Sequence, residues 1–103
     1  MNTFGINESS IDILYTIFSK YEQVKEVVLY GSRAKGNYHD RSDVDMVICN
    51  SKIDRHVLGQ IILEINNSNF PYIIDIQLFD NLKNEKLIEH ILRVGKTLYK
   101  RVN

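Results

Sequence analysis

The stretch LYGSRAKGNYHDRSDVDMVI, Leu29 to Ile48, decides the fold, because it joins two apolar segments through a Gly-Ser turn and a polar loop. The β-branched and aromatic residues that run into the glycine predict a first strand over 24–31. The segment VDMVIC predicts a second strand over 44–49. The connection between them is too short for a comfortable crossover helix, so the two strands can pair as antiparallel neighbours.

Two aspartates, Asp43 and Asp45, lie one residue apart at the start of the second strand. Side chains two positions apart on a strand point to the same face, about 6.6 Å apart at the backbone. The apolar residues Val44, Met46 and Ile48 then face the opposite way, toward a core. Two carboxylates held this close repel each other, and the arrangement persists when a cation compensates the charge or when one carboxylate is protonated. The pair therefore predicts a metal site on one face of the sheet.

The apolar spacing predicts helices over about 9–22, 54–67 and 84–94. Ser9 followed by Asp12 has the form of a capping box at the start of the first helix. These helices carry enough apolar positions to leave a patch for a partner, so a homo-oligomer or a hetero-complex is plausible.

The alternation in YIIDIQLF predicts a half-buried strand over 72–79. Gly95 stands at a C-cap position after the last helix, and the segment TLYKR predicts a short extended tail. If a short helix follows Gly31, the order of elements is α-β-α-β-α-β-α. The predicted fold class is α/β (α+β), a small mixed β-sheet flanked by helices.

Length and composition limit the classes of protein. The 103 residues predict a single domain over 1–103, and 13 basic residues balance 13 acidic ones, which disfavours binding to duplex nucleic acid. The single cysteine, Cys49, cannot form an internal disulfide and suits a reducing cytoplasm. No apolar run approaches the roughly 20 residues of a membrane span, so we expect a cytoplasmic protein without membrane association.

Asp75 supplies a third carboxylate, on the polar side of the strand over 72–79. Three aspartates suffice for two Mg²⁺ ions, about 3.5–4 Å apart, in an in-line displacement at phosphorus. In that arrangement Asp43 and Asp45 bind both ions. Asp75 binds the ion beside the attacking hydroxyl and can accept its proton.

The segment GSRAKG predicts a phosphate-binding turn. A glycine at a strand end lets backbone N–H groups approach an anion, and Ser32, after Gly31, can donate its hydroxyl to a phosphate oxygen. Arg33 and Lys35 can contact the nucleotide, but they can equally be solvated or paired with Asp40.

The loop aromatic Tyr38 can stack on a base, although a surface position is the more ordinary explanation. His39 lies between the Gly-Ser turn and the acid pair, and its role stays open. The three histidines, His39, His56 and His90, are not spaced as a metal cluster, and we expect each of them at an exposed or helix-surface position.

The pattern Gly31-Ser32, ten residues, then Asp43-Val44-Asp45, with Asp75 on a later strand, resembles the signature of the DNA polymerase β-like nucleotidyltransferase superfamily. The segments GSRAKG, SDVDMVI and ILRVGKTLYKR resemble more closely the minimal nucleotidyltransferases of bacteria and archaea. The resemblance covers nearly the whole chain. It implies a mixed sheet flanked by helices, two Mg²⁺ ions, and transfer of a nucleoside monophosphate from a triphosphate to a hydroxyl with release of pyrophosphate. It also implies that Gly31 and Ser32 bind the nucleotide, and that the three aspartates are catalytic and metal-binding.

Minimal members of this family are commonly encoded beside a small helical HEPN-type ribonuclease toxin, for which they serve as antitoxin. The resemblance therefore implies transfer of AMP from ATP to a tyrosine of such a partner. The acceptor is expected on the partner, because 103 residues leave no space for the acceptor-holding domain of larger relatives. Two alternatives stay open: a non-catalytic antitoxin that acts by complex formation, and a small-molecule nucleotidyltransferase of the aminoglycoside-modifying kind.

Overall fold

The computed structural model of the chain describes residues 2–102 and is built on a four-stranded sheet in the order β5-β4-β3-β6. Its strands are β3 (Glu26–Tyr30), β4 (Val44–Cys49), β5 (Ile74–Leu78) and β6 (Lys96–Lys100). Strand β3 pairs antiparallel with β4 and β6, whereas β4 and β5 are parallel. The predicted mixed sheet, with the first two strands as antiparallel neighbours, is confirmed.

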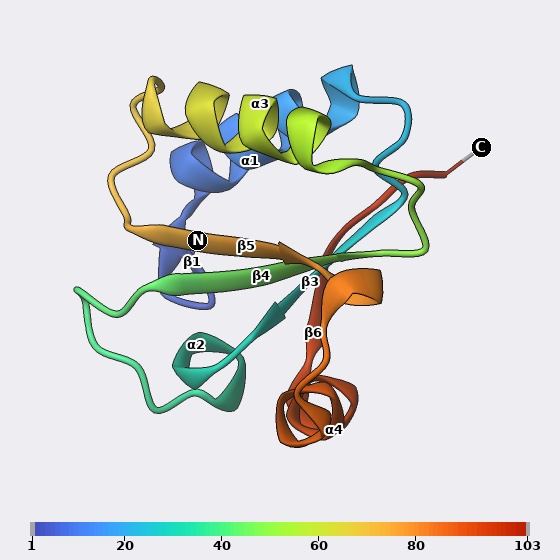
Figure 1. Cartoon of the computed structure of the whole chain (residues 1–103). Helices are drawn as coiled ribbons and strands as arrows, with labels where there is room; N and C mark the ends of the chain where they lie inside the picture. Colours follow the sequence, from blue (N-terminus) through green and yellow to red (C-terminus); the bar gives the residue numbers. More distant parts are fainter. Residues whose placement is uncertain (1, 103) are drawn as a thin grey trace.

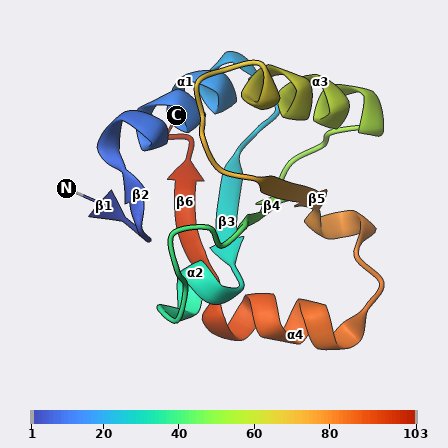
Figure 2. The same cartoon turned by 90° about the vertical axis from the view of Figure 1, so that its left-hand side faces the viewer.

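Helices cover both faces of this sheet (Figures 1 and 2). Helices α1 (Glu8–Lys20) and α3 (Arg55–Asn66) lie on one face, and α4 (Glu85–Val94) lies on the other. The short helix α2 (Ser32–Lys35) continues from the end of β3, and a 3₁₀ turn, η1 (Phe79–Asn81), follows β5. The α/β fold class is therefore confirmed.

Alternation along the strands separates two apolar clusters. The larger cluster packs between the sheet and the pair α1 and α3, and it includes Met46 and Ile76 from neighbouring strands. The smaller cluster, on the other face, is built around Tyr30, Val47 and Ile91. Because polar side chains of β4 and β5 share the face with the smaller cluster, only part of that face is available to an apolar core.

The start of α1 differs from the predicted capping box. The N-cap is Asn7, whose side chain accepts a hydrogen bond from the Ser10 N–H at 2.9 Å. Ser9 lies inside the helix, and its hydroxyl donates to the same Asn7 oxygen. Asparagine is as good an N-cap as serine, so the cap moves two residues earlier without loss of a partner.

At the ends of the chain, one prediction needs correction and one element was missed. The segment after Gly95 is not a tail but strand β6, whose Leu98 is buried in the larger cluster. The hairpin of β1 (Asn2–Thr3) and β2 (Ile6–Asn7) was not predicted, since strands of two residues show no periodicity. The Gly95 C-cap is confirmed: its N–H donates to the Ile91 carbonyl at 2.8 Å.

Within residues 2–102, no helix combines the length and apolarity that a membrane crossing requires.

Candidate active site

The turn after β3 requires glycine for two reasons. Gly31 has φ 75° and ψ −154°, a backbone conformation essentially restricted to glycine. A Cβ atom at this position would lie 2.5 Å from Oδ2 of Asp45. Gly31 therefore lets the backbone at the start of α2 approach the carboxylate of the neighbouring strand.

The sheet register places Asp45 at the centre of the site. Asp45 is paired with Tyr30 on β3 and with Asp75 on β5. Directly paired residues on neighbouring strands point to the same face of the sheet. Asp45 is half-buried, whereas Asp43 and Asp75 are exposed. The predicted acids of β4 and β5 thus lie side by side, next to the Gly31 turn.

The electrostatics of the site reflect this crowding. Burial raises the pKa of Asp45, and the charges of Asp75 and Asp43 raise it further, whereas a protonated His90 would lower it. Burial also raises the pKa of the Tyr30 hydroxyl to about 12, with Asp75 and Asp45 acting in the same direction. Without a bound ion, the protein therefore disfavours the ionised form of Asp45 beside Asp43 and Asp75. A bound cation would compensate this negative charge.

The donor chemistry fits a hard divalent cation such as Mg²⁺, which prefers carboxylate oxygens. Within residues 2–102, however, no group of three or more His, Cys, Asp and Glu side chains is already gathered to hold a metal ion. Asp43 and Asp75 are exposed, so their side chains are free to rotate toward Asp45. The fold supplies the oxygen donors on one face, and ion binding would draw them together.

Arg33 is a buried side chain whose position the sequence did not reveal. It is only 1% exposed, so it neither faces solvent nor reaches a nucleotide in the open site. Its guanidinium donates to three backbone carbonyl oxygens: Phe4 at 2.9 Å, Ser42 at 2.9 and 3.1 Å, and Asp40 at 3.3 Å.

The rings of Tyr38 and Tyr72 lie 5.1 and 4.8 Å from the guanidinium carbon of Arg33, which places both within cation–π range. Tyr38 is therefore half-buried against Arg33 and does not have the surface position that was expected. Because Ser42 directly precedes Asp43, Arg33 fixes the loop that delivers the acid pair to the strand. Lys35 is exposed at the end of α2.

His90 also differs from its prediction. His39 and His56 are exposed as expected, but His90 is half-buried against the end of β3. Its Nε2 accepts a hydrogen bond from the Gly31 N–H at 3.3 Å, and its ring lies edge-on to Tyr30 at 6.3 Å. The available signal was its spacing: His90 lies three residues after Leu87 and beside Ile91, on the inner face of α4.

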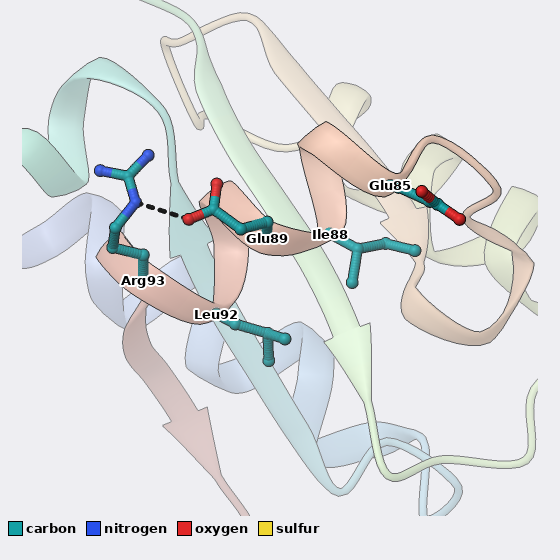
Figure 3. A pocket seen from close by; sticks show the side chains of 5 residues that line it. All are labelled: Glu85, Ile88, Glu89, Leu92 and Arg93. Atoms are coloured by element: carbon teal, nitrogen blue, oxygen red, sulfur yellow. Dashed lines mark hydrogen bonds and ion pairs between the residues drawn. The ribbon is translucent and has the colours of Figure 1, made fainter.

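A shallow hollow of about 390 Å³ lies on the outer face of α4. Figure 3 shows Ile88 and Leu92 side by side there, with Glu89 bound to Arg93. Leu92 is 73% exposed. Helix α4 therefore has one side on the candidate site, through His90, and an apolar side open to solvent.

A family model described as polymerase beta nucleotidyltransferase matches residues 9–103. A candidate protein adenylyltransferase of Methanocaldococcus jannaschii is 28% identical over 86 residues, which cover 82% of this chain and 70% of that protein. Among solved structures, a toxin–antitoxin complex with AMP-PNP has a TM-score of 0.67 at 20% identity and covers 93% of this chain and 75% of that one. The MntA–HepT toxin–antitoxin structure has a TM-score of 0.65 at 12% identity, over 92% and 74% of the two chains.

The fold and the paired acids beside a Gly-Ser turn define a nucleotidyltransferase. The chain belongs to the polymerase beta nucleotidyltransferase family, because the family model matches nearly all of it. The resemblance seen in the sequence is confirmed at this level, and the solved structures confirm the fold.

Proposed function

We propose that this chain transfers AMP from ATP to a tyrosine hydroxyl of a HEPN-type ribonuclease toxin and thereby acts as its antitoxin. The observation that carries the proposal is the register that sets Asp45 beside Asp75 and beneath the Gly31 turn. The relative named for protein adenylyl transfer and the toxin–antitoxin folds support the choice of acceptor. The reaction needs ATP, so we place it in the cytoplasm.

In the proposed reaction, Gly31 and Ser32 bind the phosphates through a backbone N–H and a hydroxyl. Asp43, Asp45 and Asp75 would hold two Mg²⁺ ions, which supply charge neutralisation at the phosphates when bound. The acceptor oxygen bonds to the α-phosphorus as the bond to the bridging oxygen of pyrophosphate breaks. Asp75 accepts the proton of the acceptor hydroxyl, and pyrophosphate leaves.

Positioning is the main task of this site, because phosphoryl transfer requires little covalent chemistry from the protein. Arg33 contributes by fixing the backbone at Ser42, one residue before Asp43. The pairing of β4 with β5 fixes Asp75 relative to Asp45. Each of the three acids is therefore tied to the sheet or to a loop anchored on it.

The experiment incubates the purified chain and the protein encoded by the neighbouring gene, as candidate toxin, with Mg²⁺ and ATP labelled at the α-phosphate. Label should appear on the toxin, and mass spectrometry should place one or more AMP groups on a tyrosine. Asp45→Asn should abolish the transfer, while the matched exposed control Asp12→Asn, on α1 at the opposite face of the sheet, should retain it.

Other outcomes identify the alternatives. If Asp45→Asn still neutralises the ribonuclease in proportion to its amount, the chain is a binding antitoxin. If an aminoglycoside is labelled without any protein partner, the chain is a small-molecule nucleotidyltransferase. No labelled acceptor in the presence of bound Mg²⁺ and ATP contradicts the proposed acceptor.

A further inference from the structure

His90 connects α4 to the Gly31 turn, and the proposed reaction gives it no task. Its Nε2 accepts the Gly31 N–H at 3.3 Å, across 59 positions in the chain. A ring nitrogen that accepts a hydrogen bond carries no proton, so this contact uses the neutral imidazole. The contact ties the inner side of α4 to the residue that turns β3 into α2.

The Gly31 N–H is a donor that must have a partner when the turn is partly buried. In the structure that partner is His90, whose Nε2 accepts the bond at 3.3 Å. In the proposed function, a phosphate oxygen uses the donors of this same turn. One N–H cannot make a good hydrogen bond to both acceptors at once.

We propose that ATP and His90 compete for the Gly31 N–H. His90 holds this donor, and α4 with it, while the site is empty, and a phosphate oxygen takes the donor when nucleotide binds. This inference rests on the proposed function, in which Gly31 binds phosphate. His90 is thus a positioning residue that couples nucleotide occupancy to α4.

The remaining contacts of α4 allow such a coupling. Ile91 packs on Tyr30 and Val47, so the helix stays attached to the sheet when His90 is released. On its opposite side, the exposed Leu92 lies beside the partly exposed Ile88 (Figure 3). Coupling between two sites is reciprocal. If bound nucleotide loosens α4 by a given factor, a partner that presses α4 onto Gly31 must weaken nucleotide binding by the same factor.

The test compares His90→Leu with His90→Gln by calorimetric titration with magnesium AMP-PNP. Leucine keeps apolar packing on Tyr30 but cannot accept a hydrogen bond, whereas the glutamine amide oxygen can. We expect His90→Leu to bind about two- to tenfold more tightly than wild type, the range set by the net contribution of one hydrogen bond. His90→Gln should bind within about twofold of wild type by the same reasoning.

A second measurement needs no substitution. In the wild-type protein, the ¹⁵N resonance of His90 Nε2 should shift as magnesium AMP-PNP saturates the site, because that nitrogen loses its donor. In His90→Leu without nucleotide, the Gly31 amide should exchange its hydrogen faster than in wild type.

The outcomes separate this inference from the proposed function. If wild type binds AMP-PNP but His90→Leu binds equally or more weakly, the competition is refuted and the proposed function stands. An unchanged His90 Nε2 resonance in the nucleotide-saturated protein refutes it as well. If wild type binds no nucleotide, the proposed function and this inference fall together.

Discussion

Gly31→Ala is the substitution that most directly tests the site, because it adds one methyl group where β3 turns into α2. The backbone conformation there, φ 75° and ψ −154°, is strained for alanine by about 1–3 kcal/mol. The new Cβ would also lie 2.5 Å from Oδ2 of Asp45, closer than real Cβ contacts allow. Both effects arise from a single small group.

The two effects have different consequences. Backbone strain lowers the free energy of unfolding, and each kcal/mol lowers the Tm of a domain of this size by roughly 4–8 °C. The clash is with the end of a side chain, which can rotate away from Gly31 at little cost in stability. Rotation moves the Asp45 carboxylate out of its position, and a misplacement of about 1 Å can lower a rate by about a hundredfold. Activity should therefore fall further than stability.

Gly36→Ala is the matched control. Gly36 also has a positive φ, 87°, but a Cβ there would meet no atom within 4 Å. Its strain is about 1–2 kcal/mol, without any effect on Asp45. Both variants are followed by thermal unfolding and by AMP transfer at a temperature at which both are folded. Equal transfer rates for the two variants, or a Gly31→Ala protein as stable as wild type, would refute the reasoning.

Three further predictions follow from the buried charges and the thiol. Folding raises the pKa of Asp45, so the ionised form of Asp45 lowers the free energy of unfolding. This loss of stability is absent below the ordinary Asp pKa and grows as pH rises through the raised pKa of Asp45 in the folded protein. Asp45→Asn should therefore have a higher Tm than wild type at about pH 7 and a smaller change in Tm between about pH 4 and 7, and a lower Tm contradicts this. Arg33→Met leaves buried carbonyls unpaired and should lower the unfolding free energy in urea by more than about 3 kcal/mol, with Arg33→Lys in between; an unchanged midpoint contradicts it. Burial raises the pKa of the Cys49 thiol to about 11, so at about pH 8 a disulfide reagent should modify it about a hundredfold more slowly than in the urea-unfolded chain; equal rates contradict this.

The acid pair and the strand of Asp75 could be predicted because their periodicity is local. The alternation around Asp43 and Asp45 fixes which side chains share a face, and the same rule applies around Asp75. The pairing of β4 with β5 was different, because the order of strands depends on contacts between distant segments. Sequence spacing alone could not show that Asp45 lies opposite Asp75 and Tyr30.

Arg33 and His90 escaped prediction for a related reason. The partners of Arg33 are backbone carbonyls at Phe4, Asp40 and Ser42, and every residue type has a carbonyl, so no sequence pattern marks them. The partner of His90 is the backbone N–H of Gly31, and no sequence pattern marks that group either. Side chains that act on backbone groups require the fold itself before they can be recognised.

The candidate site combines a charge cluster that weakens the empty protein with a turn that only glycine can make. Asp45 is half-buried beside two other acids, and Gly31 holds a backbone conformation that other residues avoid. Their positions are maintained by elements outside the reaction: the apolar cluster beneath β4, and the Arg33 guanidinium that anchors the loop before Asp43. A cation would neutralise the acids, and a phosphate would use the N–H donors of the Gly31 turn. For this reason Mg²⁺ with AMP-PNP should raise the Tm of wild type but leave that of Asp45→Asn nearly unchanged, a difference that simple surface binding of ions would not produce.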